Sequence, residues 1–208
     1  MKTPRFIASF AAVATMFAGA RLGADEVRVS DAAALRAAVA AARPGTVILL
    51  AEGVYGGGFT FARLRGEPGR PVVIASENPA KPAVFRDART GLHLSAPQHV
   101  ELRDIEFTVL YTNGLNIDDG GRRDGGARHV TLRGLRVRDV GGGGNEDGIK
   151  LSGLSDFTVE GCTVERWGAA GSAIDMVGCH RGVIRGNVFR HTLPPAANGV
   201  QCKGGSSG

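Results

Sequence analysis

The sequence predicts an all-β solenoid, a parallel β-helix, on three observations. A short motif of one small residue followed by alternating apolar and polar positions recurs five times from residue 91 onward. Its steps are 23, 34, 25 and 26 residues. The 32 glycines have no period of three, which excludes a collagen-like chain, and only 6% of the residues are aromatic. Repeats of roughly 20–50 residues built from short alternating strands indicate stacked coils.

The first 24 residues have the features of a secretory signal peptide. Met1–Arg5 carries two positive charges, and an apolar run follows from Phe6 to Ala20. Small residues suited to cleavage end at Ala20 and again at Ala24. We therefore expect a signal peptide at 1–24, a β-helix domain at 25–208 and a secreted or periplasmic protein. The alternative is a buried N-terminal helix, and no segment is long enough for a membrane span.

A short helix is expected next, over Ala32 to Ala42. Ser30 or Asp31 can cap its start, and Pro44-Gly45 ends it. This helix can close one end of the solenoid. Beyond it, short apolar runs separated by glycine and proline predict strands. These runs are Thr46–Leu50, Phe59–Phe61, Pro71–Ile74 and Ala83–Phe85.

A second alternating motif follows each of the first four copies of the repeat. If successive coils stack in register, like positions align into columns that point into the core. One predicted inward column is Leu102, Leu132, Val159 and Ile184, and another is Phe107, Val137, Val164 and Phe189. The bend between the strands falls at Asp104, Gly134, Gly161 and Gly186. A β-sandwich also has short strands, but it does not explain why one motif recurs in one order.

These residues resemble the secreted right-handed parallel β-helix proteins of the pectate-lyase-like superfamily. The N-terminal part is most similar to the chondroitinase B/alginate lyase family, through Leu35–Gly45, Thr46–Tyr55, Gly58–Thr60 and Gly69–Ser76. The resemblance covers about residues 27–208, and it is specific for fold and weak for activity. Family members carry more coils, so it implies a C-terminally truncated piece of a longer β-helix, a monomer when full length.

Stacking also predicts an outward polar face. The central column is His93, Asn116, Lys150, Asp175 and Gln201. The column two positions earlier is Thr90, Asn113, Asp147, Ser172 and Asn198, and the column two positions later is Ser95, Asp118, Ser152, Val177 and Lys203. Neighbours in a column lie about 4.8 Å apart, which is close to the length of one sugar residue. The face therefore suits an extended polysaccharide, although any solvated sheet face is polar. The insertions at 118–128 and 141–146 flank it and can wall a cleft.

The resemblance implies β-elimination on a uronate chain. Such a lyase neutralises the uronate carboxylate with Ca²⁺ or a basic side chain, and a base then removes the α proton. Lys150, Asp147 and Asp175 are the candidate catalytic residues. Lys150 and Lys203 are the candidates for the base. Asn113, Asn116, Gln201 and Lys203 are candidate substrate-binding residues. Asp118, Asp119 and Glu146, with Asp147, are candidate Ca²⁺ ligands. The family's Asn-Lys-Ser signature, its paired Glu ligands and its catalytic Lys and Arg have no match here.

Two other functions remain open. Asn145–Ile149 is similar to a polygalacturonase motif, in which Asp147 belongs to a set of carboxylates, but the Asp pair expected one coil later is Ser172-Ala173. Asp175 is the remaining candidate partner for two-carboxylate hydrolysis. The other alternative is a non-catalytic polysaccharide-binding or surface protein that uses the same face.

The net charge indicates which class of partner the protein binds. The net charge of +5 favours an anionic partner, and we expect an acidic polysaccharide. Nucleic acid is not expected, because the chain has no matching binding motif and has the features of an exported protein.

The three cysteines match no zinc spacing. Export permits disulfides, but an odd number leaves at least one thiol without an intramolecular partner, and Cys162 and Cys202 are expected to be small core residues.

Overall fold

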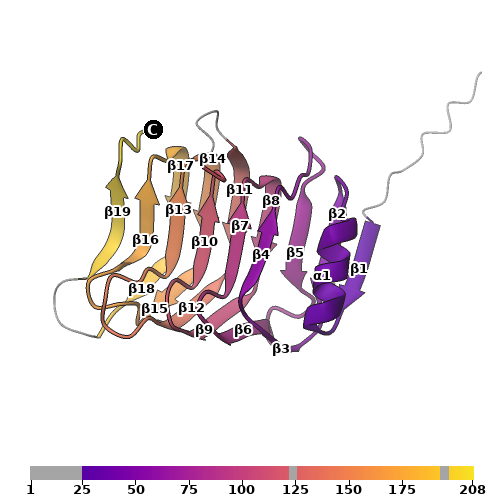
Figure 1. Cartoon of the computed structure of the whole chain (residues 1–208), viewed down its shortest axis with the longest axis horizontal. Coiled ribbons are helices and arrows are strands. Elements are labelled where there is room, and N and C mark those ends of the chain that lie inside the picture. Colours follow the sequence, from indigo (N-terminus) through magenta and orange to yellow (C-terminus); the bar gives the residue numbers. More distant parts are fainter. Residues whose placement is uncertain (1–24, 122–125, 193–196) are drawn as a thin grey trace, which may run out of the picture.

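The computed structural model describes residues 25–121, 126–192 and 197–208. These residues form a right-handed parallel β-helix of three sheets, in which every strand-to-strand pairing is parallel (Figure 1). Parallel pairing excludes the β-sandwich, whose strands are antiparallel. The signal peptide expected at 1–24 lies outside the described residues. No helix in the described part of the chain is long and apolar enough to span a bilayer.

The three sheets run along the solenoid, and each coil from β2 onward contributes one strand to each sheet, whereas β1 adds a strand to sheet A alone (Figure 1). Sheet A contains β1 (Asp25–Val29), β2 (Thr46–Leu50), β5 (Val72–Ser76), β8 (Gln98–Arg103), β11 (Ala127–Arg133), β14 (Leu154–Glu160) and β17 (His180–Arg185). Sheet B contains β3 (Gly53–Gly56), β6 (Ala83–Ala88), β9 (Glu106–Leu110), β12 (Arg136–Val140), β15 (Thr163–Glu165) and β18 (Val188–Arg190). Sheet C contains β4 (Phe59–Ala62), β7 (Leu92–Ser95), β10 (Leu115–Asp118), β13 (Ile149–Ser152), β16 (Ser172–Val177) and β19 (Asn198–Lys203).

Helix α1 (Ala32–Ala41) closes one end of the solenoid, as the sequence predicts (Figure 1). Its N-cap is Asp31, whose Oδ1 accepts a hydrogen bond from the N–H of Ala34 at 2.8 Å. Leu35, Ala38 and Val39 are buried, because they lie on the face of the helix that packs on the core.

The predicted inward columns are confirmed by the register of the strands. Leu102, Leu132, Val159 and Ile184 pair successively in sheet A, and Phe107, Val137, Val164 and Phe189 pair in sheet B. All are buried except Ile184 and Phe189, which are half-buried on the last strands of their sheets. The predicted bend is also confirmed. Asp104 has φ of 56° and its counterpart Gly134 has φ of 62°, the left-handed conformation that glycine adopts at low cost.

Three predictions need correction. The patterns missed β1, an edge strand with four of its five residues exposed, and β3, a strand of four residues with glycine at both ends. Cys202 was expected in the core but is exposed, since it lies on β19, the edge strand of sheet C. Cys162 is buried as expected, and all three cysteines are free.

Candidate functional site

The outward face of sheet C carries the polar ladder that the repeat predicts. Asn116 pairs with His93 on one side and with Lys150 on the other, and Asp175 and Gln201 continue the column. Thr60, on β4, extends it by one residue because it pairs with His93. The ladder therefore runs over all six strands of sheet C, from the end near α1 to β19.

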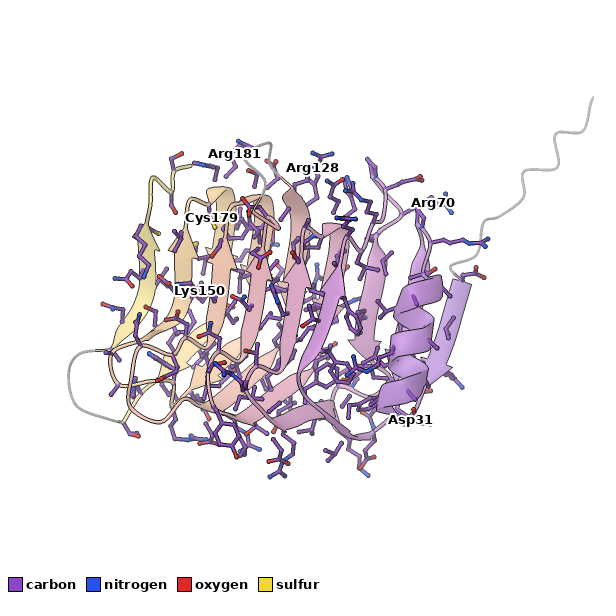
Figure 2. The ribbon with its side chains drawn as sticks, in the orientation of Figure 1. Asp31, Arg70, Arg128, Lys150, Cys179 and Arg181 are labelled. Carbon is purple, nitrogen blue, oxygen red and sulfur yellow. The ribbon has the colours of Figure 1, made fainter. Side chains whose placement is uncertain are left out.

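A cluster of two lysines and two aspartates lies toward the β19 end of the ladder. The Nζ of Lys150 contacts Asp175 Oδ2 and lies 3.5 Å from Asp147 Oδ2. Lys203 reaches the same Asp175 oxygen from β19, at 3.1 Å. Figure 2 shows Lys150 among the sheet C strands, away from Arg128 and Arg181, which lie near the starts of β11 and β17. Four of the predicted site residues, from three coils, thus converge on one point.

Asp175 departs from the prediction because it is buried rather than exposed. The residue has no solvent-accessible surface, and its Oδ1 has no hydrogen-bond partner in the described part of the chain. The physical reason is the approach of both lysine side chains, which reach over Asp175 from the adjacent strands. A buried carboxylate needs such compensation, since burial of an unpaired charge is costly.

Asp147 and Asn113 connect neighbouring coils. Asp147 is buried, and its Oδ1 accepts a hydrogen bond from the N–H of Ser172 at 2.8 Å. The N–H of Asp147 in turn donates to Asn113 Oδ1 at 2.9 Å. These side chains therefore hold three coils in register beneath Lys150. Asp147 and Ser172 are buried, which corrects the expectation of exposure at these two positions of the column, whereas Asn113 is half-buried.

The remaining predicted binding residues flank the cluster. Gln201 Oε1 lies 3.3 Å from Lys203 Nζ and 3.4 Å from Ser172 Oγ. Asn116 is half-buried between His93 and Lys150. Both residues thus border the lysine–aspartate cluster on the ladder.

Sequence reasoning missed a second polar contact on this face. The Nε2 of His93 lies 2.5 Å from Asp118 Oδ2, and Ser95 donates to Asp118 Oδ1 at 2.9 Å. Burial alone would raise the pKa of Asp118, but hydrogen bonds from His93, from the N–H of Gly120 and from Ser95 outweigh it and lower the pKa. The signal was present in the sequence, because Ser95 and Asp118 were assigned to one column beside His93.

The predicted Ca²⁺ ligands do not form one site. Asp118 and Asp119 follow one another at the end of β10, whereas Glu146 precedes the start of β13. The carboxylates also hold their own loops, since Asp119 accepts from Gly121 N–H and Glu146 accepts from Gly144 N–H. No group of three metal-binding side chains exists within the described ranges. The residues present do not fit the calcium site that the resemblance implies.

The cluster combines two positive and two negative charges and is not arranged as a pair of catalytic carboxylates. Asp147 and Asp175 are both buried and both contact the ammonium group of Lys150. An inverting or retaining glycosidase needs two carboxyl groups on either side of a sugar bond. The described geometry instead presents two lysine ammonium groups toward the solvent side, above two carboxylates.

The fold defines a class, the right-handed parallel β-helix proteins. The crystal structure of an alginate lyase from Paenibacillus sp. str. FPU-7 is similar, with a TM-score of 0.66 and 20% sequence identity. The match covers 87% of this chain and 65% of that chain. At this identity the likeness shows the fold, and the chain spans slightly less than two thirds of that lyase.

Two further solved structures match less closely. A PL6 family alginate lyase, AlyGC, has a TM-score of 0.48 at 15% identity, over 79% of this chain and 32% of that one. The pectate lyase Pel9A has a TM-score of 0.42 at 18% identity, over 81% and 48%. No protein-family model matches the chain, and no curated protein sequence matches it significantly.

Proposed function

We propose that the chain acts on an acidic polysaccharide, bound along the outward face of sheet C, by β-elimination at a uronate residue. The observation that carries the proposal is the convergence of Lys150 and Lys203 on the buried Asp175, within a polar ladder whose spacing matches a sugar chain. Lysine ammonium groups attract carboxylates, and a ladder along the solenoid axis can contact several sugars in succession.

In this proposal the two lysines have different tasks. Lys203 is the more exposed of the two, with 40% of its side chain accessible against 20% for Lys150. Lys203 would neutralise the uronate carboxylate, so that the neighbouring C5 proton becomes acidic. Lys150 would pass one of its protons to Asp175 and then take the C5 proton. The electrons of the C5–H bond form the C4=C5 double bond, the C4–O bond breaks, and the leaving oxygen takes a proton from water.

The test measures the ultraviolet absorbance of unsaturated sugar ends. Alginate, pectate and chondroitin are incubated with the wild-type chain in the presence of Ca²⁺. Lys150→Ala is expected to lower the elimination rate on the active polysaccharide by about 100-fold or more, because it removes the proposed base. Lys203→Ala is expected to raise KM. Lys81→Ala is the control, since Lys81 is exposed and pairs with Glu52 away from the ladder.

A non-catalytic binding protein is the second candidate, and one observation favours it. Both lysine ammonium groups contact carboxylates, and Asp147 and Asn113 are hydrogen-bonded to the backbone. Binding without unsaturated ends on all three polysaccharides would support this candidate and contradict the lyase. The absence of both binding and cleavage would contradict both.

A further inference from the structure

A cavity of about 350 Å³ lies at the other end of the ladder, where α1 meets β4. Three arginines line it: Arg36 on the helix, and Arg63 and Arg65 directly after the strand. All three are exposed. The cavity exists because α1 packs its apolar face over the end of the solenoid, beside the first strand of sheet C (Figure 1).

The cavity belongs to the same face as the polar ladder. Thr60 and Ala62 line it, and these residues pair in register with His93 and Ser95 on the next strand. Arg63 N–H then donates to the carbonyl of Ser95, which holds the start of the arginine segment against β7. A chain that runs along the ladder from the lysine cluster would therefore reach the cavity without leaving sheet C.

The three arginines carry positive charge that no carboxylate of the described residues compensates. Arg36 lies over the ring of Phe59, 4.6 Å from its centroid, and Arg65 donates to the amide oxygen of Gln98 at 2.8 Å. Several arginines on the other outward walls are instead paired with carboxylates, although Arg128 and Arg136 donate to an amide and a backbone oxygen. Arg133 pairs with Glu160 at 2.7 Å in sheet A, and Arg138 pairs with Glu106 at 2.6 Å in sheet B. Uncompensated guanidinium groups in a concave site are suited to bind carboxylates, often through two hydrogen bonds.

We infer that Arg36, Arg63 and Arg65 form a distal subsite for the carboxylates of the same acidic polysaccharide. This inference rests on the proposed function, because it takes the ladder as the path of the sugar chain. Strand β4 is four strand spacings from β16, which carries Asp175. At about 4.8 Å per spacing, the subsite lies about 19 Å from the lysine cluster, or about four sugar residues away. Tight binding therefore requires an oligomer long enough to occupy both ends.

The test compares uronate oligomers of two lengths by isothermal titration calorimetry. Wild-type protein is titrated with a dimer and with a hexamer, and each mixture is then assayed for unsaturated ends. The variant Arg63→Gln/Arg65→Gln is expected to bind the hexamer roughly tenfold more weakly and the dimer with unchanged affinity, since each exposed ion pair contributes only modestly. The control Arg136→Gln/Arg190→Gln makes the same charge change on sheet B and should leave both affinities unchanged.

The outcomes separate the two proposals. A wild-type chain that binds neither oligomer contradicts the proposed function and the subsite together. Wild-type binding that the Arg63/Arg65 variant leaves intact for both lengths contradicts only the distal subsite. Equal weakening of dimer and hexamer, or equal weakening by the sheet B control, shows a general effect of charge and also overturns the subsite. Circular dichroism of each variant verifies that the β-helix is folded.

Discussion

Lys150 and Asp175 face each other across adjacent strands, and their side chains form an ion pair whose acidic member is completely enclosed. The two side chains differ in burial, because 20% of the Lys150 side chain is exposed and none of the Asp175 side chain is. Loss of the lysine leaves a buried carboxylate with Lys203 as its remaining cation. Loss of the carboxylate instead leaves two lysines that can turn toward water.

This difference in burial predicts which of two substitutions destabilises the protein more. Lys150→Ala is expected to lower the free energy of unfolding by about 3 kcal/mol, since it removes one partner of a buried charge. Asp175→Asn should cost only about 1 kcal/mol, because the freed ammonium groups can be hydrated. Urea unfolding measures both, with Lys81→Ala as the exposed control. The reverse order would show that the cluster does not bury its carboxylate as described.

Gly148 is a site where a single methyl group does not fit. A Cβ added there would lie 2.8 Å from the carbonyl oxygen of Ala173 and closer still to Val164 Cγ1. Gly148→Ala is therefore expected to lower the unfolding free energy by about 1–3 kcal/mol through overpacking. Gly142 has no atom within 4 Å of the same position, and Gly142→Ala should change stability by less than about 0.5 kcal/mol. Equal effects at the two glycines would contradict the close stacking of coils at this column.

Acid should weaken the contact between His93 and Asp118. Because the pKa of Asp118 is lowered below its ordinary 3.8, its contribution to stability is complete above that pH and is lost as the pH falls through the folded-state value. Asp118→Asn should therefore lower the Tm at neutral pH. Below about pH 4 the Tm of this variant should fall less steeply with acid than the Tm of the wild type. Asp25→Asn, a substitution on the exposed strand β1, is the control. A variant with the acid profile of the wild type would contradict the assignment.

The three thiols should differ in reactivity. Burial raises the pKa of Cys162 to about 11 and also raises that of Cys179, so neither forms much thiolate at neutral pH. Cys202 is exposed. We expect a thiol reagent to modify Cys202 rapidly in the folded reduced protein and all three cysteines after unfolding. Mass spectrometry of the labelled peptides measures this, and rapid labelling of Cys162 in the folded state would contradict its place in the core.

The repeat was sufficient to predict the register of the solenoid. Leu102, Leu132 and Val159 occupy equivalent places in successive copies, and a parallel stack allows one alignment of those copies without turning apolar residues outward. The outward column through Asn116, Lys150 and Asp175 follows from the same register. Two strands were not predicted: β1 is a mostly exposed edge strand, and β3 has only four residues, two of them glycine.

The candidate site was predictable only in part. Lys150, Asp147 and Asp175 were placed on neighbouring coils, but the pattern treats every outward position as exposed. It therefore could not show that Asp175 is enclosed, or that Lys203 reaches it diagonally from β19. The calcium ligands were grouped by their chemistry in the sequence, whereas Asp118 is the last residue of β10 and Glu146 lies in the loop before β13.

The sequence by itself determined the repeating coil, the parallel stacking of its strands and the two faces of each strand, because these depend on the period of apolar side chains along one chain. Only the tertiary structure decided which charges meet. The ion pairs of Asp175 depend on the directions of long side chains from three strands, and the arginine cavity depends on how α1 packs against β4. Neither arrangement produces a periodic pattern in the sequence, since both arise from contacts between residues far apart in the chain.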